Sequence, residues 1–130
     1  MPQSTSKSPA TDITSLQKKI LQFRDARDWK QFHNPKDVAL SLVLEATEVM
    51  EHFQWKTPEE IKKYLQTHTP DIAAELADVF YWVLLMSHDL GIDIGEALEK
   101  KLKVNALKYP VKKSKGKHSK YTRTFSKRGR

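Results

Sequence analysis

Four acidic side chains in this 130-residue sequence have types and spacing suited to binding a hard divalent cation. Glu45 and Glu48 form one pair and Glu75 and Asp78 form the other, each spaced i, i+3 within an apolar, helix-forming run. Positions i and i+3 lie about 60° apart on a helix, so the two acids of a pair project together. Acids are rarely buried unless they are paired or bind a cation. Two such helices side by side would therefore line an oxygen-rich metal pocket.

The composition of the pocket favours particular metals. All of its ligands are oxygen and no histidine pattern matches them, which favours Mg²⁺ or Mn²⁺ over zinc. A di-iron carboxylate bundle needs a Glu-x-x-His motif on two helices, and no Glu here has a His three residues later. One alternative stays open for the earlier helix, in which Glu45, Glu48 and Glu51 form an exposed acidic edge paired with Lys or Arg.

Helices must position these acids, because apolar residues recur at helical spacing and no segment alternates as a strand does. Asn34-Pro35 and Thr57 with Glu60 are typical helix starts, and Gly91 is a typical residue after a helix end. We predict an all-α fold, an antiparallel bundle of four to five helices, with the helix of Glu75 and Asp78 buried all round. The predicted helices span residues 12–29, 35–54, 57–66, 70–91 and 93–109.

Charge divides the chain into parts. The net charge is +7, but residues 111–130 hold nine Lys and Arg and no acid, which leaves 14 basic and 16 acidic residues before them. We predict a disordered leader over residues 1–11, one domain over 12–110 and a basic tail over 111–130. The tail could bind nucleic acid without sequence specificity, which we keep as an alternative function.

Several other classes of protein are disfavoured. The sequence has no cysteine, which excludes thiol catalysis and zinc–thiolate sites and fits a reducing, cytoplasmic location. Residues 1–11 contain no apolar stretch, so we expect no secretory signal. The longest apolar run, residues 72–90, is interrupted by acids that are costly in a bilayer, so we expect no membrane span.

The motifs together resemble a known family. Glu45-x-x-Glu48, 26 intervening residues and then Glu75-x-x-Asp78 resemble the signature of the all-α nucleoside triphosphate pyrophosphohydrolases, the MazG-like superfamily. The resemblance is closest to the dCTP pyrophosphatase branch. It is carried by RDWKQFHNP at residues 27–35, FQWK at 53–56, EL-x-DV at 75–79 and N-x-x-KYP at 105–110. Two positions differ from the family: Asp37 stands where the family usually has Asn, and Trp82 stands where it often has Tyr.

The resemblance implies an activity and a site. The chain would cleave a nucleoside triphosphate, dCTP or a modified form first, between its α- and β-phosphates, and Glu45, Glu48, Glu75 and Asp78 would hold Mg²⁺. It further implies assembly into a homodimer or homotetramer. The predicted substrate-binding residues are Trp29, His33, Trp55, Trp82, Asn105, Lys108, Tyr109 and Lys120.

Hydrolysis also needs a group that removes a proton from the attacking water. A carboxylate outside the innermost ligand shell could do this, and Glu48 or Glu51 is our candidate. A third reading of the acids is structural, as interface ion pairs of a helical oligomer. Binding of Mg²⁺ would separate that reading from the enzymatic one.

Overall fold

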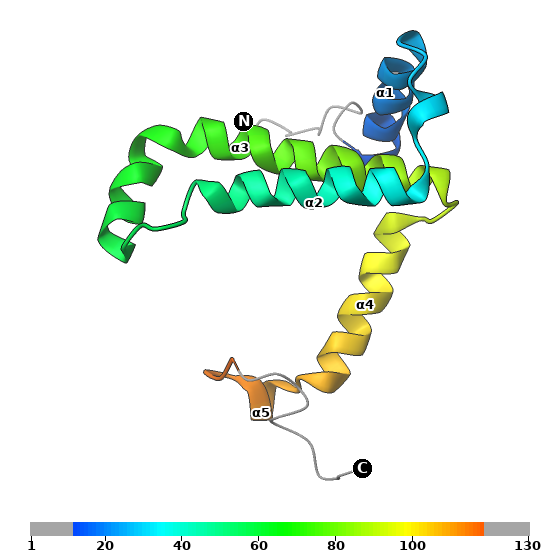
Figure 1. The fold of residues 1–130 in the computed structure, drawn as a ribbon. Helices are drawn as coiled ribbons and strands as arrows, with labels where there is room; N and C mark the ends of the chain where they lie inside the picture. Colours follow the sequence, from blue (N-terminus) through cyan, green and yellow to red (C-terminus); the bar gives the residue numbers. More distant parts are fainter. Residues whose placement is uncertain (1–11, 119–130) are drawn as a thin grey trace, which may run out of the picture. The chain divides into compact units, whose positions relative to one another are not determined.

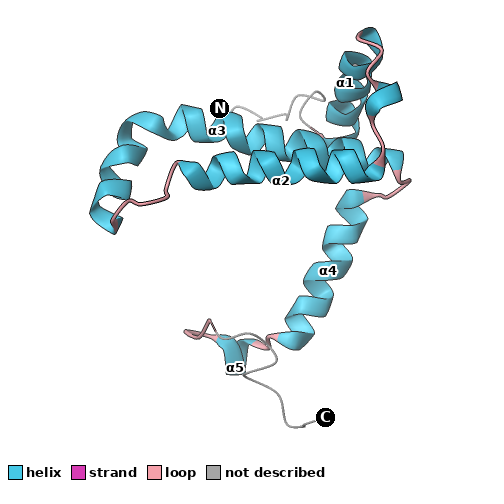
Figure 2. Ribbon diagram, viewed as in Figure 1, coloured by secondary structure: helices cyan, strands magenta, loops and turns pink. Residues whose placement is uncertain are grey.

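The computed structural model describes residues 12–118, and every regular element within that range is helical (Figure 2). The predicted all-α class is therefore confirmed, whereas the predicted oligomer stays a prediction. A short 3₁₀ helix, η2 (Lys30–Phe32), lies in the segment between the predicted helices 12–29 and 35–54. The α-helices are α1 (Ile13–Ala26), α2 (Pro35–Glu51), α3 (Pro58–Asp89), α4 (Ile94–Lys108) and α5 (Val111–Ser114). None of the helices in residues 12–118 is both long enough and apolar enough to cross a membrane.

The chain divides into two compact units, Met1–Ile92 and Asp93–Arg130. The first contains α1, α2 and α3, and the second contains α4 and α5. The domain limits drawn from the sequence stay a prediction. The predicted leader and the tail from residue 119 onward lie outside the described residues.

In the first unit, α2 runs antiparallel to α3, and α1 also packs on α3 (Figure 1). The side chain of Asn34 accepts a hydrogen bond from the Asp37 amide at 2.9 Å, with proline at the first helical position, so the predicted start of α2 is confirmed. The predicted capping box of Thr57 and Glu60 is also present. Between the helices lies a small core, formed by Val38, Ile72, Leu84 and Leu85.

The predicted break between residues 66 and 70 is wrong, because α3 continues through Pro70. An internal proline removes an N–H donor and leaves a carbonyl of the preceding turn without its usual partner. Side chains supply hydrogen bonds in this region: the Thr69 hydroxyl donates to the Leu65 carbonyl at 2.6 Å, and the Thr67 hydroxyl donates to the Tyr64 carbonyl at 3.4 Å. The helix bends in its N-terminal part instead of ending (Figure 1).

Two further expectations are corrected. Helix α2 ends at Glu51 rather than near residue 54, because the chain turns there and Trp55 adopts a positive φ of 70°. The helix that carries Glu75 and Asp78 is not buried all round: Leu76 is 53% exposed and Phe80 is 44% exposed. The reason is that α1 and α2 cover only part of its circumference.

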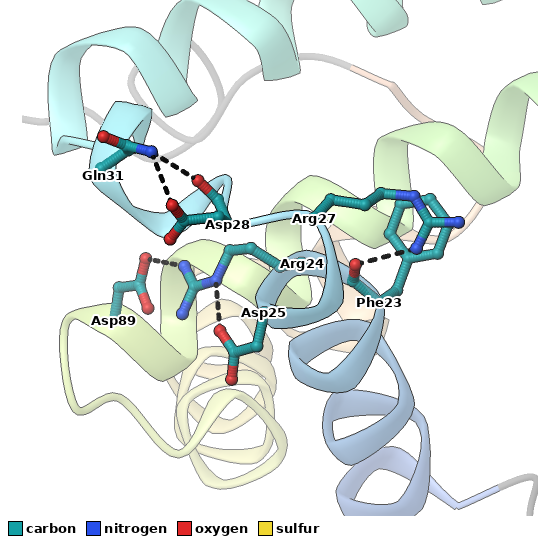
Figure 3. Close-up of polar contacts among 7 residues, drawn as sticks. All are labelled: Phe23, Arg24, Asp25, Arg27, Asp28, Gln31 and Asp89. Carbon is teal, nitrogen blue, oxygen red and sulfur yellow. Dashed lines mark hydrogen bonds and ion pairs between the residues drawn. The ribbon is translucent and has the colours of Figure 1, made fainter.

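A partly buried ion pair joins the C-terminal ends of α1 and α3 (Figure 3). The Arg24 side chain is 2% exposed, and its Nη1 donates to Asp89 Oδ2 at 2.7 Å. A second acid, Asp25, lies 3.9 Å from Arg24 Nε but is 65% exposed. A buried guanidinium needs an acidic partner, so Asp89 holds the C-terminal end of α1 in place. The chain continues from this end into residues of the candidate site.

We expect Asp89→Ala to lower the free energy of unfolding by about 3 kcal/mol, because it leaves Arg24 buried without its carboxylate. Urea unfolding followed by circular dichroism measures this loss. Asp25→Ala is the matched control, because the Asp25 carboxylate is exposed and lies farther from Arg24, and such a contact contributes at most about 1 kcal/mol. Equal effects of the two substitutions would contradict the role given to Asp89.

Candidate active site

The antiparallel pairing of α2 and α3 brings the four predicted acids together. One carboxylate oxygen from each of Glu45, Glu48, Glu75 and Asp78 lies within 4.8 Å of the others. Glu45 and Glu75 are half-buried, whereas Glu48 and Asp78 are exposed. This convergence of two i, i+3 pairs favours a metal pocket over the exposed acidic edge. The role of each acid as a ligand stays a prediction.

The cluster is electrostatically unfavourable by itself. Burial, followed by the charges of Glu48, Asp78 and Glu75, raises the pKa of Glu45. A hydrogen bond with Glu48 raises the pKa of Glu75, as do burial and the charges of Glu48 and Asp78, while His52 opposes the shift. Carboxylates held this close therefore favour either a proton or a cation.

The donor atoms fit a hard divalent cation. Glu45 Oε2 and Glu75 Oε2 are buried and have no hydrogen-bond partner within residues 12–118. Buried polar atoms normally have partners, and a cation between the helices would provide one for both. The donors are carboxylate oxygens throughout, which suits Mg²⁺ or Mn²⁺.

A cavity of about 470 Å³ opens beside the acids. Its size is within the range of ligand pockets, about 300–1,000 Å³. Two of the acids, Glu45 and Asp78, form one part of its lining. Four aromatic side chains from α1, the following turn and α3 form most of the rest, namely Phe23, Trp29, Tyr81 and Trp82. The cavity thus combines flat apolar surfaces with an adjacent acidic cluster.

The turn after α1 positions Trp29. Asp28 has a φ of 54°, and the amides of Asp28 and Trp29 donate to the carbonyls of Asp25 and Arg24 at 3.1 and 3.2 Å. This is the pattern of a left-handed helix end, in which Asp is tolerated better than most residues. The Gln31 amide secures it by donating to the Asp28 carbonyl at 2.9 Å (Figure 3). Trp29 then packs edge-on against Phe23, with ring centroids 5.7 Å apart.

His33 and Trp55 are not placed in this cavity. His33 lines a different cavity of about 370 Å³, and its ring lies edge-on to Trp82 with centroids 5.4 Å apart. Burial, with a smaller contribution from the charge of Arg24, lowers the pKa of His33, while Asp89 opposes this. Trp55 lies in the turn between α2 and α3 and is 91% exposed. Their predicted contacts with a base stay predictions.

The remaining predicted residues belong to the second unit or lie beyond the described range. Asn105 and Lys108 are on α4, and Tyr109 caps its C-terminus. Lys120 lies outside the described residues. Their roles toward a substrate also stay predictions.

Reasoning from the sequence missed a third cavity, of about 470 Å³, on the side of the cluster formed by Glu48 and Glu75. Glu51, His52 and Tyr64 complete its lining, and of these only Glu51 was a candidate. A signal for His52 exists in the sequence, since Glu45, Glu48 and His52 recur at i, i+3 and i+7 on one helix face. No comparable signal marks Tyr64, because a loop and a helix bend bring it to this place.

A helical fold in which paired acids face one another across two helices defines a recognised class of protein. Comparison with known proteins assigns this chain to that class. Residues 40–123 match the model of the MazG-like family. The chain therefore belongs to the MazG-like family, and the resemblance inferred from its motifs is confirmed.

Particular relatives define its place in that family. The chain is 32% identical over 117 residues to mouse (Mus musculus) dCTP pyrophosphatase 1, which covers 88% of this chain and 69% of the relative. It is 30% identical over 117 residues to the human (Homo sapiens) dCTP pyrophosphatase 1, with the same coverage. The crystal structure of a pyrophosphatase from Archaeoglobus fulgidus aligns with a TM-score of 0.72 and 32% identity, covering 75% of this chain and 92% of that one.

Proposed function

We propose that this chain is a Mg²⁺-dependent nucleotide pyrophosphohydrolase that cleaves dCTP or a modified dCTP to the monophosphate and pyrophosphate, in nucleotide-pool sanitation. The observation that carries the proposal is the convergence of four acids within 4.8 Å beside an aromatic cavity. The names of the relatives, dCTP pyrophosphatase 1 and a pyrophosphatase, support the class of reaction.

The acidic cluster and a nucleoside triphosphate are both anionic, so a cation must lie between them. Glu45, Glu48, Glu75 and Asp78 would hold it. Bound there, Mg²⁺ would neutralise phosphate oxygens and lower the pKa of an attacking water. In the reaction, the water oxygen forms a bond to the α-phosphorus, and the bond from that phosphorus to the bridging oxygen breaks. Pyrophosphate leaves with the bonding electrons.

A carboxylate must take the proton that this water loses. Glu51 is exposed and lines the same cavity as Glu48 and Glu75, but it does not belong to the group of four acids. From this position Glu51 could accept a proton from the attacking water without being a ligand of the cation. We therefore favour Glu51 over Glu48 as the general base.

The aromatic cavity would hold the base of the nucleotide. Trp29, Tyr81 and Trp82 line it, and stacking on such rings contributes about 1–3 kcal/mol per base. Because Glu45 and Asp78 lie at the same cavity, a base seated there places its phosphates next to the acids. We keep His33, Trp55, Asn105, Lys108, Tyr109 and Lys120 as proposed further contacts.

We also propose a homodimer or homotetramer. Apolar side chains on the outer faces of α2 and α3 are more than 40% exposed in the single chain, among them Leu40, Val43, Leu44, Leu76 and Phe80. Surfaces of this kind are usually covered by a partner. Light scattering measures the assembly.

A panel of ribo- and deoxyribonucleoside triphosphates, incubated with Mg²⁺ and resolved by product chromatography, tests the activity. We expect dCTP to give dCMP and pyrophosphate, with kcat/KM higher for dCTP and its 5-substituted forms than for purine nucleotides. Release of orthophosphate as the first product would contradict cleavage between the α- and β-phosphates. Equal cleavage of every base would contradict the role of the aromatic cavity.

A further inference from the structure

A histidine and a tyrosine, joined by a hydrogen bond, lie within ion-pair distance of one of the four acids. His52 Nδ1 lies 2.6 Å from the Tyr64 hydroxyl, and His52 Nε2 lies 3.8 Å from Glu75 Oε1. The His52 side chain is 15% exposed and that of Glu75 is 25% exposed. His52 caps the C-terminus of α2, while Tyr64 and Glu75 lie on α3, on either side of Pro70.

The ring of Tyr64 is itself held in place. It stacks on His68, with ring centroids 3.9 Å apart and planes 6° apart. The Lys56 ammonium lies 4.4 Å from the centroid of the same ring. Together with the bend of α3, these contacts hold the hydroxyl against His52.

The two oxygens of Glu75 have different surroundings. Oε1 faces His52, whereas Oε2 is buried without a hydrogen-bond partner among the described residues. A carboxylate that is restrained through one oxygen presents the other in a defined direction. Residues that contact a metal ligand and fix its orientation usually contribute about 10–100-fold to metal affinity.

We propose that His52 and Tyr64 are positioning residues that orient Glu75 toward the cation. The Tyr64 hydroxyl donates to His52 Nδ1, which leaves the ring proton on Nε2, facing Glu75 Oε1. Glu75 Oε2 is then directed into the cluster of acids. This inference rests on the proposed function, because it requires Glu75 to be a metal ligand.

The test measures Mg²⁺ binding by calorimetry in the absence of nucleotide. His52→Leu introduces an apolar side chain of similar bulk and removes both nitrogens, and we expect it to raise the Kd for Mg²⁺ by about 10-fold or more. His52→Gln restores an N–H donor, and we expect its Kd within about threefold of the wild type. Tyr64→Phe keeps the ring and its stacking, and we expect it to raise the Kd for Mg²⁺ by a smaller factor than His52→Leu does.

Kinetics separate positioning from a general loss of structure. In both weakened variants, the Mg²⁺ concentration at half-maximal rate should rise while kcat at saturating Mg²⁺ stays within about threefold of the wild type. The double variant that combines His52→Leu with Tyr64→Phe should bind Mg²⁺ no more weakly than His52→Leu alone, because Tyr64 acts through His52. His88→Leu, at an exposed histidine on α3, is the matched control and should change neither quantity.

The outcomes distinguish the two proposals. If the wild type binds no Mg²⁺ and releases no pyrophosphate, the proposed function fails. If the wild type binds Mg²⁺ but His52→Leu and Tyr64→Phe bind it equally well, the positioning inference fails while the function stands. Should His52→Leu not fold, Tyr64→Phe and His52→Gln decide the inference, since both preserve the packing.

Discussion

Replacing Glu48 with Gln, or Asp78 with Asn, should lower kcat/KM for dCTP by at least about 100-fold while the chain stays folded. Loss of a partner outside the ligand shell costs about 10–100-fold, so loss of a ligand itself should cost more. Both side chains are exposed and both replacements preserve shape, so packing should not suffer. Each replacement also removes one charge that repels Glu45.

Pyrophosphate release at several Mg²⁺ concentrations measures the loss of kcat/KM. Thermal unfolding without Mg²⁺ measures the stability of each variant. We expect the melting temperature of each variant to equal or exceed that of the wild type. Glu59→Gln is the matched control, because Glu59 is exposed in the first turn of α3 and lies outside the cluster. Activity near the wild-type value in Glu48→Gln and Asp78→Asn would refute the metal site.

Removal of the cation is the second change for which we expect a large effect. Chelation with EDTA should abolish pyrophosphate release, and Mg²⁺ should restore it. Because the cation binds the folded chain, 100 times its Kd should stabilise the protein by about 2.7 kcal/mol. Denaturant unfolding with and without Mg²⁺, at matched ionic strength set with NaCl, measures this stabilisation.

The metal-free protein should also respond to pH in a defined direction. The pKa values of Glu45 and Glu75 are raised above 4.5 in the folded state. The contribution of these groups to stability is therefore fully present below about pH 4.5 and is lost as pH rises through their folded-state pKa values.

A comparison of variants isolates this contribution. The wild type without Mg²⁺ should lose stability relative to Glu45→Gln as pH rises from about 4.5 toward neutrality. Saturating Mg²⁺ should remove the difference or reverse its sign, because only the wild type keeps the complete ligand set. Parallel stability curves for the two proteins without Mg²⁺ would contradict the repulsion within the cluster.

Features governed by neighbouring residues could be predicted from the sequence. The helix starts at Asn34 and Thr57 and the left-handed residue Gly91 follow from local capping rules. The i, i+3 spacing likewise indicated which acids share a face. The same rules failed at Pro70, where they predict a helix start and α3 instead continues through the proline.

Features governed by distant residues could not be predicted. The Arg24–Asp89 pair joins positions 65 residues apart, and a single sequence does not reveal such a contact. The aromatic cavity depends on the left-handed turn at Asp28, a residue that is usually not left-handed. Tyr64 and His52 lie 12 positions apart on different helices or their ends, and no local pattern in the sequence marks their contact.

The distribution of the three tryptophans gives the protein an intrinsic optical signal. Two indoles, those of Trp29 and Trp82, line the cavity beside the acids, while that of Trp55 is 91% exposed in the turn between α2 and α3. A molecule entering the cavity would alter the fluorescence of the first two. Occupancy of the site could thus be followed without a dye or a coupled assay.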